Sequence, residues 1–381
     1  MQPINFKEYP PSKKFLFDKL EKITMPTNKT EQYRHFGIKQ ILENDYNIVK
    51  NEQTEPVITE QLLIEEGIVK EVPKGVSVTF CDDFEIDEEY EDAMYLLSHL
   101  TSLRIICIEV RDDISFELKH CFHTPNSLLS YRIYITSIEN KKAQVFETFD
   151  FLGSENSLLL YGVEANIKEN GVLRWIRDTK AGQKQSRIVG THRFDVKKEA
   201  TVQLKTFDFS TADSLHLYKI DLSEYSWADV THLLLSSKNV KQGNIVTINH
   251  NAPYGKCVHD ARSILRDSSV SIFDGRVRVR KGSNFASARQ NSKAVLLDDN
   301  AKMYAKPQLE IYTDEVEASH GATIGELDED ALFYLCSRGI SFEEAKKMLV
   351  IAFADTLIDT AGDEELIQTL HTDFEEAYYL I

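Results

Sequence analysis

The sequence predicts a mainly β protein in which a central β domain is flanked by two helical regions. Apolar residues recur at helical spacing near the start of the chain and again after Leu327. Between about Leu103 and Thr313 the chain consists instead of short runs rich in Val, Ile, Phe, Tyr and Thr, interrupted by Gly, Asn and Asp. We therefore expect a helical region over residues 1–75, a β core over 76–322 and a helical domain over 323–381.

The N-terminal region shows two amphipathic helical patterns. The first apolar face comprises Phe15, Leu16, Leu20 and Ile23, and the second comprises Phe36, Ile38, Ile41 and Leu42. Pro26 separates the two helices, because its ring and missing N–H disfavour a continuing helix. The stretch 58–69 predicts a third helix that ends near Gly67. The acidic run 82–92 lacks the ligand spacing of an EF-hand loop, which favours a solvated loop or helix face over a calcium site.

The β core is expected to be either a sandwich or a β-helix of stacked rungs. In the run 276–280 valines alternate with arginines, which turns one face inward and the other to water. Turn residues such as those at 274–275 and 281–284 end short β runs at intervals that suit both architectures. Small residues alternating with apolar ones at 286–288 and 301–305 favour stacked rungs, but periodicity alone does not decide between the two.

The C-terminal region has well-marked helix boundaries. Asp328 is expected to cap a first helix, and Gly339 suits its left-handed C-terminal cap. The residues expected to face inward on this helix are Ala331, Leu332 and Leu335. Ser341 begins a capping box, and Gly362 ends the second helix. A third helix over 363–379 completes a predicted small bundle with acidic outer faces.

Composition and charge argue against several kinds of partner. The chain has 44 basic and 61 acidic residues, and its net charge of −17 would repel nucleic acid and anionic membranes. The first residues contain no apolar signal core, and no run approaches the roughly 18 apolar residues of a membrane span. Five scattered cysteines, never spaced as Cys-x-x-Cys, predict neither a disulfide framework nor a zinc ribbon: Cys81, Cys107, Cys121, Cys257 and Cys336. We expect a cytoplasmic protein.

Enzyme motifs are missing, so histidine and cysteine pairs are the remaining chemical candidates. The sequence has no Gly-rich phosphate loop, no Gly-x-Ser-x-Gly elbow and no His-Glu-x-x-His pair, so nucleotide binding and hydrolase chemistry have no supporting motif. Cys121 and His123 share one strand face, as do Cys257 and His259, but two ligands are not a site and packed strands are the favoured interpretation. His320 precedes a glycine at a domain junction, and its spacing fits a ligand role and a buried structural role equally well.

The run 307–325, centred on Ser319-His320-Gly321-Ala322-Thr323, is the most distinctive segment of the sequence. Further motifs stand at Phe273-Asp274-Gly275-Arg276, Gln290-Asn291-Ser292-Lys293, His250-Asn251-Ala252-Pro253 and, near the start, from Met25 to Phe36. Together these segments resemble the SufB/SufD family of iron-sulfur cluster assembly proteins. The likeness is most specific between about residues 270 and 353 and weak between about 75 and 245.

This resemblance implies a right-handed parallel β-helix with the helical regions at its flanks. It also implies that subunits pair through their β-helices, that the C-terminal helices dock SufC, an ABC-type ATPase, and that clusters are built at the pairing interface. The candidates for ATPase docking are Phe333, Tyr334, Arg338, Gly339, Ile340 and Met348. No tightly bound cofactor is expected, only transient iron or an iron-sulfur cluster at the interface.

Two positions make the chain resemble the D-type members most, and a third departs from the D-type pattern. The cysteine that B-type members carry 28 positions before the histidine is Ser292 here, and the glutamate that follows their histidine is Gly321. D-type members commonly have Cys-Ser-His, whereas Ala318 stands here and leaves His320 as the candidate iron or cluster contact. A SufB-like partner is therefore expected to supply the thiolate, and a homodimer of the isolated chain stays open.

Two other hypotheses remain. One is a secreted-type β-helix enzyme that acts on an acidic polysaccharide with calcium held by aspartates, against which the missing signal segment argues. The other is a self-associating structural β-helix without metal chemistry. Co-purification with an ATPase and a B-type subunit would separate both from a scaffold for cluster assembly.

Overall fold

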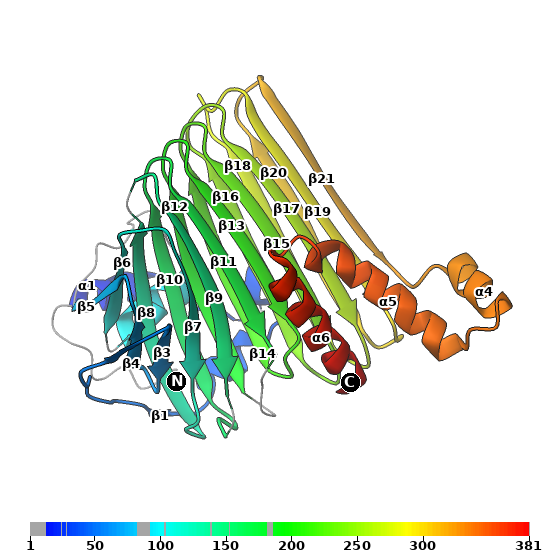
Figure 1. Ribbon diagram of the computed structural model, residues 1–381, viewed down its shortest axis with the longest axis horizontal. Coiled ribbons are helices and arrows are strands. Elements are labelled where there is room, and N and C mark those ends of the chain that lie inside the picture. The colour runs from blue at the N-terminus through cyan, green and yellow to red at the C-terminus, as the bar shows by residue number, and fades with distance from the viewer. Residues whose placement is uncertain are drawn as a thin grey trace.

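The computed structural model describes residues 13–23, 25–27, 29–81, 92–102, 104–137, 139–151, 153–180 and 186–380, and strands dominate them (Figure 1). The strands before the main run are β1 (Asn47–Ile48), β2 (Val57–Thr59), β3 (Gln61–Glu65), β4 (Ile68–Pro73) and β5 (Val76–Cys81). The main run comprises β6 (Ile105–Val110), β7 (Ile114–Cys121), β8 (Ser127–Ser137), β9 (Lys142–Asp150), β10 (Leu158–Ile167), β11 (Val172–Thr179), β12 (Arg187–Val196), β13 (Thr201–Asp208), β14 (Asp213–Leu222), β15 (Trp227–Ser236), β16 (Lys241–His250), β17 (Lys256–Leu265), β18 (Val270–Val279), β19 (Ala286–Leu296), β20 (Lys302–Ile311) and β21 (Val316–Gly325). The helices are α1 (Lys14–Lys22), the 3₁₀ helix η2 (Glu31–Tyr33), α2 (Ile38–Glu43), α3 (Ala93–Thr101), α4 (Glu329–Ser337), α5 (Phe342–Ile358) and α6 (Glu364–Leu380).

The main run forms a parallel β-solenoid made of two facing sheets. Sheet A has the strand order β20-β18-β16-β14-β12-β10-β8-β6-β5, with β1 on β8, and sheet B has the order β2-β4-β3-β7-β9-β11-β13-β15-β17-β19-β21. Consecutive strands from β6 onward therefore alternate between the sheets, and neighbouring strands of this run within a sheet are parallel, whereas β5–β6 and β3–β4 are antiparallel. The predicted mainly β fold with a parallel β-helix core and flanking helices is confirmed.

Asparagines in left-handed conformations at the turns explain part of the interruptions between the short β runs of the sequence. Asn126, Asn140, Asn156 and Asn170 have φ between 53° and 61°, the left-handed region that asparagine tolerates better than most residues. The Asn156 side-chain amide donates to Asn126 Oδ1 across 3.0 Å, so equivalent turns of successive rungs are linked. A turn of this kind repeats along the solenoid because each rung stacks on the preceding one.

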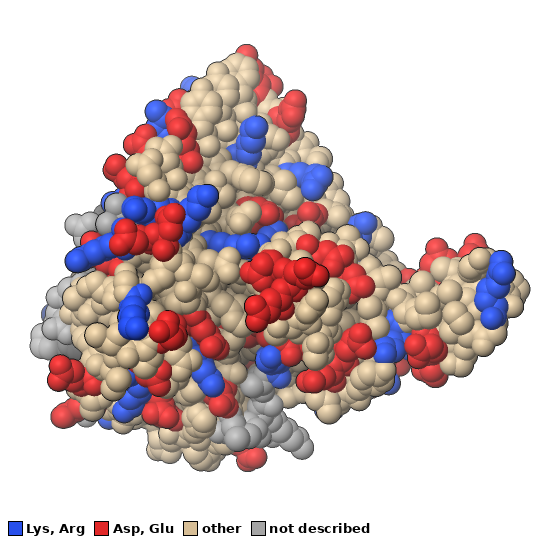
Figure 2. Space-filling view, viewed as in Figure 1, with Lys and Arg blue, Asp and Glu red and all other residues tan. Residues whose placement is uncertain are grey.

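Helices α1, α2 and α3 cover part of one sheet, and α5 and α6 cover part of the other. Apolar residues of α1, α2 and α3 pack against sheet A, with Leu158 and Leu160 among the residues that they cover. On the other side, Val350 of α5 and Phe374 of α6 pack against Phe209 and other residues of sheet B. Acidic side chains gather over the α5 and α6 region (Figure 2). Among the described residues, no helix has the length and apolar character that crossing a membrane requires.

Three expectations about local structure need correction. The stretch 58–69 is not a helix: it forms parts of β2, β3 and β4, because Leu62 and Ile64 are buried at strand spacing and β3 pairs with β7. The C-terminal helices do not form a three-helix bundle, since α4 buries no residue and projects away from the solenoid (Figure 1). Phe15 is exposed, although its predicted partners Leu16 and Leu20 are buried.

Other local predictions agree with the structure or fall outside it. Asp328 accepts a hydrogen bond from the Ala331 amide and Ser341 accepts one from the Glu344 amide, so both predicted caps are formed. Residues 82–91 of the acidic run lie outside the described part of the chain. Asp92, its last member, caps α3 by accepting hydrogen bonds from the amides of Met94 and Tyr95.

Candidate functional site

The predicted site residue His320 lies at the open end of the solenoid. Strands β20 and β21 end sheets A and B, and each is ten residues long with no described strand beyond it. His320 is in register with Gln290 of β19, whose side chain is buried inside the solenoid. The His320 side chain is exposed because no further rung covers it. The last rung therefore exposes to solvent the positions that point into the solenoid on earlier rungs.

A column of polar side chains leads from the interior to His320. On successive strands of sheet B the same position is occupied by His259, Gln290 and His320. The Gln290 side-chain amide donates to His259 Nδ1 across 3.2 Å. Burial lowers the pKa of His259 to about 3, so this imidazole is neutral and able to accept that hydrogen bond. The column brings a fixed, uncharged donor–acceptor pair directly beneath the exposed histidine.

Gly275 is required by this arrangement. A Cβ atom at position 275 would lie 2.1 Å from Gln290 Nε2 and 2.8 Å from the Phe273 ring. Any side chain there would displace Gln290 from its place under His320. This close approach gives a physical reason for the glycine in the sequence Phe273-Asp274-Gly275-Arg276.

The column is the last part of a longer file of polar and aromatic side chains inside the solenoid. Its members, all buried, are His120, Glu147, Tyr161, Trp175, Arg177, His192, His216, Tyr218, His232 and His259. Arg177 Nη1 contacts both His216 Nδ1 and Tyr218 Oη at 2.6 Å, and the His232 and His259 rings lie 5.2 Å apart. Within the described residues, the Nε2 atoms of His232 and His259 have no protein hydrogen-bond partner. Such groups are costly to bury, which argues that they are not merely core filling.

The structure brings the positions that define the subtype close to His320 in register. Ser292 is buried on β19 and pairs with Ala322 of β21. Ala318 lies two residues before His320 on the same face of β21 and packs partly against the core. A Cβ at Gly321 would meet only Asn291 Oδ1, at 3.8 Å, so this glycine is not needed for steric reasons.

The residues predicted to dock a partner form a second surface on α4 and α5. The side chains of Phe333, Tyr334 and Met348 are 76%, 57% and 42% exposed. The Arg338 guanidinium carbon lies 5.2 Å from the centroid of the Tyr334 ring, and Gly339, just after α4, has φ of +89°. Ile340, next in the chain, is half-buried. This surface is a projecting apolar helix face rather than part of the solenoid.

A groove of about 700 Å³ adjoins that helix face. Phe333 and Leu332 of α4, Phe342 of α5 and Leu297 after β19 are among the side chains that line it. Large apolar groups are thus exposed both on α4 and in the groove at its base. Exposed apolar surface of this extent is typical of sites that bind another protein.

Sequence reasoning missed the residues beneath His320. Gln290 follows His259 by 31 residues and precedes His320 by 30, which matches the spacing of equivalent positions on successive rungs. A search for polar residues repeated at about this spacing would have found the column. The predicted role of His320 and the predicted docking residues remain predictions.

The fold defines a parallel β-solenoid protein in which β20 and β21 are uncovered within the described residues. Residues 120–353 match the family model described as "SUF system FeS cluster assembly, SufBD core domain". The chain belongs to this family and is most like SufD.

Several curated proteins are similar to the chain. It is 28% identical to the iron-sulfur cluster assembly protein SufD of Escherichia coli over 62% of this chain and 56% of that protein. It is 24% identical to the chloroplastic protein ABCI7 of Arabidopsis thaliana over 62% of this chain and 50% of that protein. A SufD of Bacillus subtilis is 36% identical over 25% of this chain and 22% of its own length. The chain spans about half the length of the first two relatives.

Proposed function

We propose that this chain is a non-enzymatic SufD-like subunit of a complex that assembles iron-sulfur clusters and that it pairs with a SufB-like subunit through the open end of its solenoid. The observation that carries the proposal is the pair of uncovered ten-residue edge strands, β20 and β21. Unpaired strand edges are templates for pairing with another chain. Ile311 and Ile324 at this end are 41% and 45% exposed, which gives a partner apolar surface to bury.

His320 is proposed to contact iron or a nascent cluster, which is cargo of the complex rather than its resident cofactor. A neutral imidazole is a competent ligand for iron. The nearby positions 292 and 318 carry serine and alanine, so this chain offers no thiolate there. Thiolate ligands and the acceptor for sulfur therefore belong to the SufB-like partner.

A SufC-like ABC ATPase is proposed to bind at α4 and the start of α5. This chain has no phosphate-binding loop of its own, so ATP chemistry requires another subunit. The exposed apolar residues Phe333, Tyr334 and Met348 and the adjoining groove support this docking surface. The groove begins at Glu326, just beyond the end of β21, so this surface leaves the length of the β21 edge free for the other partner.

Pairing is tested with two neighbouring arginine substitutions on β21. Ala322 is in register with buried Ser292, and no further rung among the described residues covers it. Thr323 faces the other side of the strand. We expect Ala322→Arg to abolish co-purification with the SufB-like subunit, because a charge would enter the interface. Thr323→Arg is the matched control and should pair normally. Normal pairing by both variants, or a complex of two copies of this chain alone, would contradict the proposed pairing.

Docking of the ATPase is tested by Phe333→Ser in the full chain. The side chain is exposed, so the variant should fold normally while ATPase binding is lost. Phe285→Ser, at a 50% exposed aromatic residue on a turn of the solenoid, serves as the control. Retained ATPase binding in the Phe333 variant would move the docking surface away from α4.

A further inference from the structure

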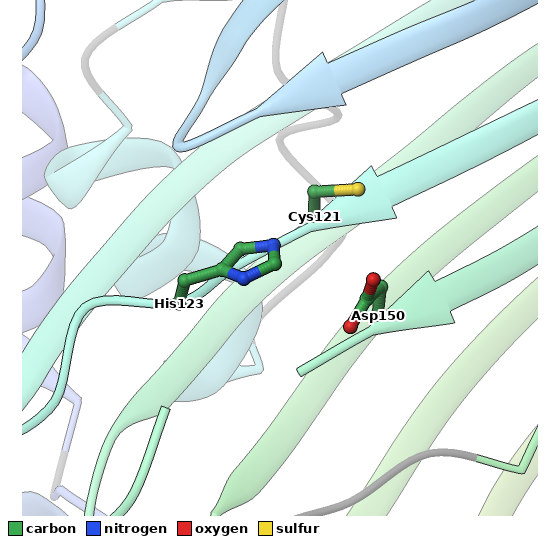
Figure 3. A group of neighbouring side chains, drawn as sticks. All are labelled: Cys121, His123 and Asp150. Atoms are coloured by element: carbon green, nitrogen blue, oxygen red, sulfur yellow. The ribbon is translucent and has the colours of Figure 1, made fainter. Parts of the chain in front are cut away.

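Three side chains with different metal-binding groups meet at the carboxyl ends of β7 and β9 in sheet B, far from His320. One ligand atom each from Cys121, His123 and Asp150 lies within 4.8 Å of the others. Figure 3 shows that the side chains come from the end of β7, the segment after it and the end of β9. Six strands of sheet B separate β7 from β21, so this cluster is not part of the open end.

The solenoid itself creates the cluster. Cys121 and Asp150 are the last residues of β7 and β9 and are direct partners in the parallel register. The Phe122 amide donates to the Asp150 carbonyl across 2.9 Å, which extends the pairing by one residue. His123 follows Cys121 by two residues, the spacing that returns a side chain to the same face. The Asp150 contribution explains why the sequence showed only two of the three ligands.

Glu66 fixes the segment that carries His123. Its Oε1 atom accepts hydrogen bonds from the amides of His123 and Thr124, at 2.7 and 3.0 Å. Its own amide donates to the Cys121 carbonyl across 2.9 Å. Residues beyond the end of a strand are usually mobile, but these hydrogen bonds hold the segment in position. The histidine is therefore presented by an anchored backbone, as binding sites require.

We propose that Cys121, His123 and Asp150 bind one divalent metal ion of the zinc type and leave a coordination position open to solvent. Sulfur, imidazole and carboxylate are the three ligand types of zinc sites, and three protein ligands with an open position are a common arrangement. Bond lengths of about 2.0–2.3 Å put tetrahedral ligand atoms roughly 3.5 Å apart, so the cluster contracts by about 1 Å on binding. His123 is exposed and Asp150 half-buried, which gives an ion access to the site.

Protonation of the thiol gives the proposal a measurable signature. Burial is the main cause that raises the pKa of Cys121 to about 11; Lys119 lowers this pKa, and the Asp150 carboxylate raises it. The thiol is therefore protonated near neutral pH in the metal-free chain. Since the thiolate is the ligand, binding must release that proton, and the affinity should rise with pH.

The test is a titration of the full-length, metal-stripped chain with Co²⁺. We expect one equivalent to bind with a thiolate-to-cobalt charge-transfer band and to be displaced by Zn²⁺. Cys121→Ser should abolish the band. His123→Gln and Asp150→Asn should each weaken Co²⁺ binding by at least about 10–100-fold, the range seen when a supporting partner of a metal site is lost. Circular dichroism would verify that all the variants are folded.

Cys107→Ser is the matched control. Cys107 and Cys81 interact on the neighbouring strands β6 and β5 of sheet A, so these two thiols are the alternative source of a cobalt–thiolate band. The control should leave the band, the stoichiometry and the affinity unchanged. A band that survives in Cys121→Ser and disappears in Cys107→Ser would overturn the proposal. So would binding without a charge-transfer band, or the absence of binding by the wild-type chain.

Discussion

Two histidines on one column, His259 and His320, show how the covered rungs differ from the open end. Both occupy the position that Gln290 occupies between them, on consecutive strands of sheet B. His259 is fully buried, and burial lowers its pKa to about 3. His320 is exposed because β21 is the last strand of its sheet. The same residue type is thus enclosed where a rung covers it and exposed to solvent where none does.

The largest effect in the covered region is expected for Arg132→Ala. The Arg132 guanidinium lies 2.9 Å from Glu164 Oε1 and also donates to Thr191 Oγ1, all in a buried environment. Removing it leaves the Glu164 carboxylate buried without its main counter-charge, which should cost about 3–5 kcal/mol of unfolding free energy, measured in urea. Arg289→Ala, which removes a 64% exposed partner of Asp260, should cost less than about 1 kcal/mol. Equal losses of unfolding free energy in the two variants would contradict the expected difference between the buried and the exposed ion pair.

Acid should reveal the same buried ion pair. Although burial alone would raise it, the Arg132 guanidinium and the His99 ring lower the pKa of Glu164 from 4.5 to about 2. A carboxyl whose pKa is lower in the folded state stabilises the fold above its unfolded pKa. That stability is lost as the pH falls through the folded pKa. As the pH falls from about 5 to 2, the loss of this contribution should therefore lower the free energy of unfolding by roughly 3 kcal/mol.

The matched variant Glu164→Gln isolates this contribution to acid unfolding. Its unfolding free energy should depend less on pH over the same window, because the amide does not titrate. Denaturant titrations of both chains at several pH values measure the difference. Parallel pH profiles for the two chains would contradict the assignment.

Replacing the covered histidine of the column should have an intermediate effect. His259→Ala opens a cavity and leaves the Gln290 amide without its acceptor, so the unfolding free energy should fall by roughly 2–3 kcal/mol. Thermal and urea unfolding would both measure the loss. Unchanged stability would mean that the interior tolerates a gap at this rung and that the column is not tightly packed.

The smallest effect on stability is expected for His320→Ala. An exposed side chain at an uncovered position should change the unfolding free energy by no more than about 0.5 kcal/mol. In the reconstituted complex, however, we expect slower cluster formation with unchanged subunit composition, measured by absorbance of the forming cluster. Ser319→Ala, its neighbour on the opposite face of β21, is the control. Cluster formation at the normal rate in the His320 variant would rule out the ligand role.

Particular elements show how far the sequence could be interpreted. The caps Asp328 and Ser341 act through residues three positions away, so local sequence predicted them correctly. The stretch 58–69 was predicted wrongly, because its apolar residues fit helical spacing as well as the strand spacing that pairing with β7 imposes. The spacing of apolar residues distinguishes a helix from a strand only where it fits one of the two and not the other.

The sequence by itself determined the mainly β core and the flanking helices, and through a family motif it predicted His320 as a site residue. Only the tertiary structure decided which side chains meet. Gln290 lies under His320, and Asp150 lies beside Cys121, although 30 and 29 residues separate them in the chain. The physical reason is that the register between rungs depends on turn lengths and on packing across the whole solenoid. Whether a polar residue is buried or exposed then depends on whether another rung covers it.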